Sequence, residues 1–499
     1  MDSPMDEKLA VKHVEELHSA NAHVQEFDPV IVKRIVRKTD FILVPLVTLL
    51  FLLNFIDRAA VGNANVAGLS KDLKLSAEKY QYNIGLGSSF LSTALMIFYI
   101  FYIIVEPISN LILKKVGYLW LSFLVVGFGA VTIGSAFMKN YGEFVVVRIL
   151  LGCTEGGVIP AVAFILSRFY TRRELAFRFG IFLALGPTLS GAFGGLLAAG
   201  LLNLGSIGSV KGWRCIFLVE GILTTGVGIL SIFLLADSPE TARFLSAEEK
   251  VIASARVAAE HIGNSRKPAT RKTTIQGFAN IQVWLCAFGY GFVNIIVQGT
   301  SLFLPTVVRT LGNYSTIEVQ LRSVPPYIVA CVYTLTISWL CSRTRRHGIF
   351  IIGSMLLSCV GYIIFLASTN KAVLYFATFL TFSGAVPCGP IFLSWAAANS
   401  APDTSRAIAT AIVPGVGTWG SIVATWAYLP KYAPRFVPGN ALNTAGALAA
   451  AAVAGGILLY VQNENKLREQ GRRDHRLEGL SQDEIDDLGN RHPDFRLLI

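Results

Sequence analysis

The sequence predicts an all-α membrane protein with twelve transmembrane helices in two six-helix halves. Only 15% of the 499 residues are charged and 53% are hydrophobic, whereas a soluble chain carries about a quarter charged residues. The apolar residues gather in segments of about 20, the length that a helix needs to cross a bilayer. Helices and closed barrels alone satisfy every backbone group in lipid, and long uninterrupted apolar runs indicate helices.

A long polar stretch at 237–279 divides these segments evenly and predicts a cytoplasmic linker. We expect an N-terminal tail over 1–40, halves over 41–236 and 280–462, and a C-terminal tail over 463–499. Two parallel halves joined in this way are typical of transporters whose site lies between the halves near the midplane. The twelve predicted spans are about 41–63, 84–106, 116–138, 143–166, 177–202, 213–236, 280–304, 321–341, 348–368, 372–397, 407–429 and 442–462.

The net charge of +11 is a signal of topology. Most of the 43 Lys and Arg residues fall in the two tails and in loops on the same side, which predicts that both termini are cytoplasmic. Because the charge is spread over separate loops, we do not expect nucleic acid as a partner. The sequon Asn313-Tyr314-Ser315 lies in a loop predicted to face outside, which makes Asn313 a candidate glycosylation site.

Four charged residues lie inside the predicted spans of the first half: Asp57, Arg58, Arg148 and Glu155. Charges at this depth are costly unless paired or hydrated, and they usually mark an ion or substrate path. Arg148 and Glu155 are two helical turns apart on nearly one face. Arginine can fix an anion by forked hydrogen bonds, and a desolvated carboxylate can exchange protons. The alternative is a structural ion network between the first and fourth helices.

Further polar residues could complete such a site. Glu106 ends the second span and is a candidate for proton coupling, although it could also cap the helix. The substrate-binding candidates of the second half are Tyr290, Asn294 and Gln298 on the seventh span and Ser394, Trp395 and Asn399 on the tenth. The alternative role of these polar residues is hydrogen bonding between helices.

Other function classes lack their motifs in this sequence. The chain has no P-loop, no Ser-His-Asp set and no dinucleotide glycine motif in a suitable context. The seven Cys residues contain no CxxC pair and read as small buried residues. We therefore expect a protein that is not an enzyme, has no cofactor or metal, and draws energy from a proton gradient.

Several motifs spread over nearly the whole chain carry a family resemblance. They are Asn54-Phe55-Ile56-Asp57-Arg58, Glu106-Pro107, Arg148 with Gly152 and Glu155-Gly156-Gly157, Gly212-Trp213-Arg214, and the tail Leu488-Gly489-Asn490-Arg491-His492-Pro493-Asp494-Phe495-Arg496. Together they resemble the major facilitator superfamily, and within it the anion:cation symporter family and its fungal allantoate and nicotinate (vitamin) permease branch. The loop between spans 2 and 3 and the loop between spans 8 and 9 depart from the superfamily pattern, because neither has an acidic residue before its basic run.

The resemblance implies the major facilitator fold and proton-coupled symport of a small organic anion, nicotinate-like or another carboxylate, by alternating access. It implies that Asp57 and Glu155 carry protons, and that Arg58 and Arg148 hold the anion or balance charge. We expect a monomer in the bilayer of the plasma membrane. Export of a secondary metabolite and a non-transporting nutrient sensor remain alternative functions.

Overall fold

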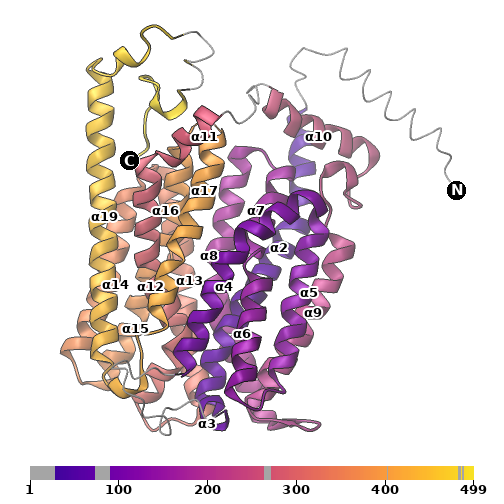
Figure 1. The fold of residues 1–499 in the computed structure, drawn as a ribbon, viewed down its shortest axis with the longest axis vertical. Coiled ribbons are helices and arrows are strands. Elements are labelled where there is room, and N and C mark those ends of the chain that lie inside the picture. The colour runs from indigo at the N-terminus through magenta and orange to yellow at the C-terminus, as the bar shows by residue number, and fades with distance from the viewer. Residues whose placement is uncertain (1–27, 74–89, 263–270, 402, 481–484, 486–487) are drawn as a thin grey trace, which may run out of the picture.

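The structure, a computed structural model, describes residues 28–73, 90–262, 271–401, 403–480, 485 and 488–499. Twelve of the described helical segments are long and apolar enough to cross a membrane, which confirms the predicted fold class. Figure 1 shows these helices in two side-by-side bundles, with the N-terminal half in indigo to magenta and the C-terminal half in orange to yellow.

The N-terminal half contains six spans. Its helices are α2 (Pro29–Val66), the short α3 (Leu69–Asp72), α4 (Phe90–Val116), α5 (Tyr118–Ser135), α6 (Tyr141–Glu155), α7 (Val158–Phe169), α8 (Arg172–Leu204) and α9 (Arg214–Leu234). A two-residue antiparallel ladder between β1 (Ser206–Ile207) and β2 (Val210–Lys211) joins α8 to α9, with Ser206 opposite Lys211.

The predicted linker holds two helices, α10 (Ala247–Ile262) and α11 (Arg271–Phe278). A capping box forms at the start of α10: Ser246 N donates to Glu249 at 2.9 Å, and Glu249 N donates to Ser246 Oγ at 3.2 Å. The second half follows with α12 (Ile281–Thr310), α13 (Thr316–Thr344), α14 (His347–Ala367), α15 (Lys371–Ala385), α16 (Cys388–Ala398), α17 (Asp403–Gly417), α18 (Trp419–Ala424) and α19 (Val437–Glu469).

The fourth and tenth spans are each broken near the middle. The fourth consists of α6 and α7, which meet at Gly156-Gly157, and the tenth consists of α15 and α16, which meet at Val386-Pro387. Gly156 and Gly157 also allow close packing, because a Cβ on either would collide with α4 at Tyr102 or Ser109. The shared break agrees with the similar Gly and Pro content of the two spans.

Each half has its own apolar core, and a third cluster joins the halves at one end. That cluster combines Val61 and Ala64 of α2 with Leu302 and Phe303 of α12 and with Tyr428. The contact is close, because a Cβ on Gly62 would collide with the carbonyl oxygen of Leu302. This joined end carries α3, whereas α10 and α11 lie at the opposite end with the start of α2 and with Ile499 (Figure 1).

Polar bonds reinforce the joined end. Arg309 Nη1 on α12 donates to the carbonyl of Val66 at 2.7 Å, and Gln320 Nε2 on α13 donates to the carbonyl of Asn63 at 3.2 Å. Asn313 is exposed in the loop between α12 and α13 at this end. Its glycosylation stays a prediction.

Candidate transport site

A cavity lies between the two halves at the middle of the spans. The cavity volume is about 60 Å³. Both halves contribute to its wall. Pro187 of the fifth span, Val386 and Pro390 at the break of the tenth span, and Pro414 of the eleventh span line it. The polar lining residues are Arg58, Tyr99, Tyr102, Glu106, Tyr290, Asn294, Gln298, Thr418 and Ser421.

Arg58 is the positively charged residue in the described lining of the cavity, and its partner Glu155 lies behind that lining. Its Nε donates to Glu155 Oε2 at 2.9 Å, with the arginine 8% exposed and the glutamate fully buried. Asn54 Nδ2 donates to the same oxygen at 3.0 Å. The guanidinium also faces the rings of Phe55 and Tyr102, with its carbon 5.1 and 4.9 Å from their centroids. Arg58 therefore joins the cavity to the buried acid.

Asp57 and Arg148 lie deeper in the first half and do not line the cavity. Thr132 Oγ1 on α5 donates to Asp57 Oδ1 at 2.5 Å, while Asp57 Oδ2 has no hydrogen-bond partner among the described residues. Arg148 is 2% exposed and interacts electrostatically with Asp57 and Glu155. The structure therefore brings together the four charges that the sequence singled out.

The three candidates on α12 all line the cavity. Gln298 accepts a hydrogen bond from Tyr99 on α4 at 3.0 Å, so this pair spans the two halves. Asn294 Nδ2 donates to the carbonyl of Gly417 at 3.1 Å. Tyr290 packs tightly on Gly417, where a Cβ would collide with its ring. These residues thus also make the interhelical contacts that were their alternative role.

Glu106 lines the cavity from α4, half-buried. Two other residues of α4, Tyr99 and Tyr102, line it as well, and sequence reasoning missed them. The signal was available: Tyr99, Tyr102 and Glu106 are spaced i, i+3 and i+7, which places three polar side chains on one helical face.

Ser394, Trp395 and Asn399 lie outside the described cavity lining. Ser394 is exposed and donates to the carbonyl of Ile391. Trp395 Nε1 and Asn399 Nδ2 both donate to the carbonyl of Leu498, each at 2.9 Å, and Asn399 Oδ1 accepts from Leu498 N at 2.7 Å. Trp395 and Asn399 hold the C-terminal segment, and we leave all three residues out of the proposed substrate site.

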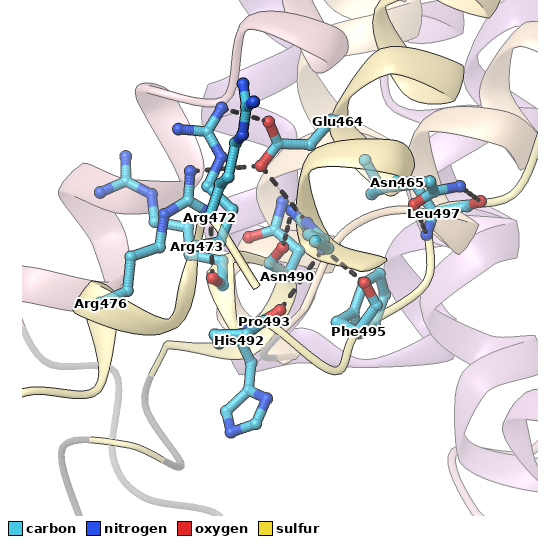
Figure 2. A network of polar contacts seen from close by, with 12 residues as sticks. Glu464, Asn465, Arg472, Arg473, Arg476, Asn490, His492, Pro493, Phe495 and Leu497 are labelled. Carbon is cyan, nitrogen blue, oxygen red and sulfur yellow. Dashed lines mark hydrogen bonds and ion pairs between the residues drawn. The ribbon is translucent and has the colours of Figure 1, made fainter. Parts of the chain in front are cut away.

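The C-terminal segment 488–499 lies against the ends of α14, α16 and α19: His347 N donates to the carbonyl of Ile499, and Asn490 N donates to that of Ala401. Figure 2 shows its contact with Asn465 of α19. Asn465 on α19 pairs with Leu497 through both backbone groups, at 2.9 and 3.0 Å. Leu497 is 6% exposed and belongs to the core of the second half. Arg468, also on α19, donates to the carbonyls of Asn490 and Phe495.

Glu464 anchors the arginines around this segment. It accepts from Arg473 at 2.5 Å and pairs with Arg476 at 3.2 Å and Arg468 at 3.3 Å (Figure 2). Because several charges form one partly buried network here, the contacts are worth more than isolated surface pairs. The tail motif noticed in the sequence is thus a docking segment.

A family model described as Major Facilitator Superfamily matches residues 47–425, more than half of the chain. The chain belongs to this superfamily. Among similar proteins, an uncharacterized transporter of Schizosaccharomyces pombe is 33% identical, with 88% of each chain covered. The high-affinity nicotinic acid transporter of Saccharomyces cerevisiae is 31% identical, covering 83% of this chain and 75% of the other.

Solved structures agree on the fold of this superfamily member. A bacterial homolog to the human lysosomal transporter Spinster, in an inward-facing and unoccupied conformation, matches with a TM-score of 0.60 and 14% identity, covering 84% of this chain and 96% of the other. With the twelve spans and the relatives named as transporters, this makes the chain a multi-pass membrane transporter and confirms that it is not an enzyme.

Proposed function

We propose that this transporter is a proton-coupled symporter of a small organic anion, with a nicotinate-like monocarboxylate as the first candidate. The observation that carries the proposal is the position of Arg58, which lines the cavity while its guanidinium pairs with buried Glu155. A substrate carboxylate in the cavity would compete with Glu155 for this cation. Protonation of Glu155 would release the guanidinium, so that proton and anion bind together.

Three further observations support the proposal. Glu106 adds a second acid to the cavity wall, and Asp57 adds a third behind it. The aromatic rings around Arg58 suit a flat aromatic acid. One relative, 31% identical, is named a nicotinic acid transporter. In this proposal both termini and α10 are cytoplasmic, the membrane is the plasma membrane, and the working unit is a monomer.

The position of the joined end fits this orientation. The halves are joined at the end that carries α3, so the cavity is shut from the outside when α10 and α11 face the cytoplasm. The structure would then be an inward-facing state of the alternating-access cycle.

Substitution of Arg58 tests the anion site. Arg58→Lys should weaken competition by unlabelled nicotinate about 10- to 100-fold, because a hydrogen bond to a charged group contributes about 1.5–3 kcal/mol and lysine cannot reproduce the fork. The measurement is inhibition of labelled nicotinate uptake, with allantoate, pantothenate, biotin and short dicarboxylates as competitors.

Arg309→Lys is the matched control, because Arg309 lies outside the described cavity lining and donates to Val66 at the joined end of the halves. An unchanged apparent affinity in Arg58→Lys would count against direct anion contact. Labelled substrate that leaves preloaded cells faster than it enters them would favour export.

A further inference from the structure

Glu220 is a buried acid that the proposed site leaves unused. It lies on α9 within the apolar run Phe217-Leu218-Val219-Glu220-Gly221 and is 2% exposed. Neither of its carboxyl oxygens has a hydrogen-bond partner among the described residues, and no described Lys or Arg forms an ion pair with it. An ionised carboxylate in this setting is strongly unfavourable, so the side chain is expected to be neutral and to carry a proton.

Helix α9 packs on both α5 and α2, the helices that carry Thr132 and Asp57. A Cβ on Gly221 would lie 2.5 Å from the backbone nitrogen of Ile133. The residue before Ile133 is Thr132, whose hydroxyl donates to Asp57. Glu220 therefore lies beside the same stretch of α5 that bonds Asp57, and it interacts electrostatically with that acid.

A charge count shows why this pair matters. The buried cluster of the first half holds three acids, Asp57, Glu155 and Glu220, against the two cations Arg58 and Arg148. Glu155 is bonded to Arg58, and Arg148 interacts with Asp57. Glu220 has no cation of its own among the described residues, so one proton on the cluster makes it neutral. Two like-charged acids that share one cation do not ionise together readily.

We propose that Glu220 is a second proton-holding site of this transporter, paired with Asp57. In this conformation the proton resides on Glu220. It passes to the Asp57 carboxylate when the first half rearranges, which leaves Glu220 ionised and Asp57 neutral. The proton count stays constant in this step. The role of the pair in coupling rests on the proposed symport, whereas the neutral state of Glu220 does not.

Infrared spectroscopy of the membrane-reconstituted protein tests the neutral state directly. The native protein at neutral pH should show the carbonyl-stretch band of a protonated carboxyl in a dry environment, and Glu220→Gln should lose it. Thr224→Val is the matched control, because Thr224 is also buried and lies one turn away on α9. It should keep the band. A spectrum that is the same in Glu220→Gln and the native protein would overturn the proposal.

Proton flux tests the coupling role in the same liposomes, with nicotinate as the transported probe and a pH-sensitive dye inside. Glu220→Gln should lower the number of protons moved per nicotinate, and Thr224→Val should leave it unchanged. Loss of the infrared band with an unchanged proton ratio would overturn the coupling role. Nicotinate movement without proton flux in the native protein would instead contradict the proposed symport itself.

Discussion

Arg58 stands in two environments at once. One side faces the cavity and the rings of Phe55 and Tyr102, and the other side bonds Glu155. The pair is almost fully buried, so its desolvation cost is high and its attraction must offset much of that cost. Such a balance is sensitive to one proton or one anion. This sensitivity is what a coupled transporter needs from a residue.

Glu155→Gln removes the exchangeable proton and keeps the shape of the side chain. The variant should still exchange labelled for unlabelled nicotinate across a membrane, because the cavity and Arg58 are intact. It should fail to accumulate nicotinate on a proton gradient, because the side chain is fixed in its neutral form. Counterflow and gradient-driven uptake in the same liposomes measure the two activities. Normal accumulation would remove Glu155 from the coupling role.

The sequence reveals charged site residues more readily than neutral ones. Asp57, Arg58, Arg148 and Glu155 stand out because charge inside an apolar run is costly, and the structure places them together. Tyr99 does not stand out, since a tyrosine in a membrane helix is common and its partner Gln298 is 199 residues away. Trp395 and Asn399 are polar on a span, yet sequence alone does not show that Leu498 binds them.

At the scale of elements, the break between α15 and α16 connects the tail to the cavity. Gly389 and Pro390 at the start of α16 line the cavity, and Trp395 and Asn399 at its other end hold Leu498. The docked tail therefore fixes the end of a short helix whose other end forms the cavity wall.

Leu497→Asp should release the tail. A charge cannot remain in the apolar core at this position, and undocking leaves Trp395 and Asn399 without the carbonyl of Leu498. Each unsatisfied buried group costs about 1–3 kcal/mol, so the purified protein should unfold at a temperature lower by several degrees. Asp494→Ala is the control, because Asp494 is 89% exposed. Equal melting temperatures of the native protein and Leu497→Asp would show that the docking contributes no stability.

The linker helix α10 docks on the first half through a pH-sensitive contact. Lys38 on α2 donates to Glu249 at 2.7 Å, and this bond, with the backbone bond from Ser246, lowers the pKa of the Glu249 carboxyl. A lowered pKa in the docked state means that the contact contributes at neutral pH and is lost as the pH falls through that pKa.

The docking of α10 should therefore weaken when the pH falls below the ordinary pKa range of a glutamate. A fluorophore placed at Val251, which is 59% exposed, should show lower anisotropy at acid pH than at neutral pH. Lys38→Met should lower the anisotropy at neutral pH and flatten the pH response. The same pH response in Lys38→Met and the native protein would assign it to another contact.

The sequence predicted which helices exist better than it predicted the residues at which they begin and end. Twelve apolar runs predicted twelve spans. The first helix nevertheless begins at Pro29, within the predicted tail 1–40, because Asp28 caps it and the helix continues beyond the apolar run. Likewise α19 continues to Glu469, past the predicted end at 462, where Arg468 binds the C-terminal segment and Glu464 pairs with Arg473. Hydropathy marks the lipid-facing part of a helix and not its polar extension.

At the scale of the whole molecule, two halves that each have their own core and are joined at one end suit alternating access. Each half packs on itself, one apolar cluster joins the halves at the end that carries α3, and α8 packs on α13 across the boundary between the halves. Gly62 permits that meeting, since any side chain there would strike Leu302. The sequence predicted the halves from the six-plus-six layout. It could not predict which end is joined, because one sequence serves both states of such a cycle.

The central claim is that proton and organic anion move together. The purified protein in liposomes, loaded at neutral pH and diluted into acid buffer with labelled nicotinate, tests it most directly. We predict accumulation above the outside concentration, proton entry with the nicotinate, and loss of accumulation when a protonophore is added. Nicotinate uptake that reaches only the outside concentration, with no response to the pH gradient or the protonophore, would contradict the account.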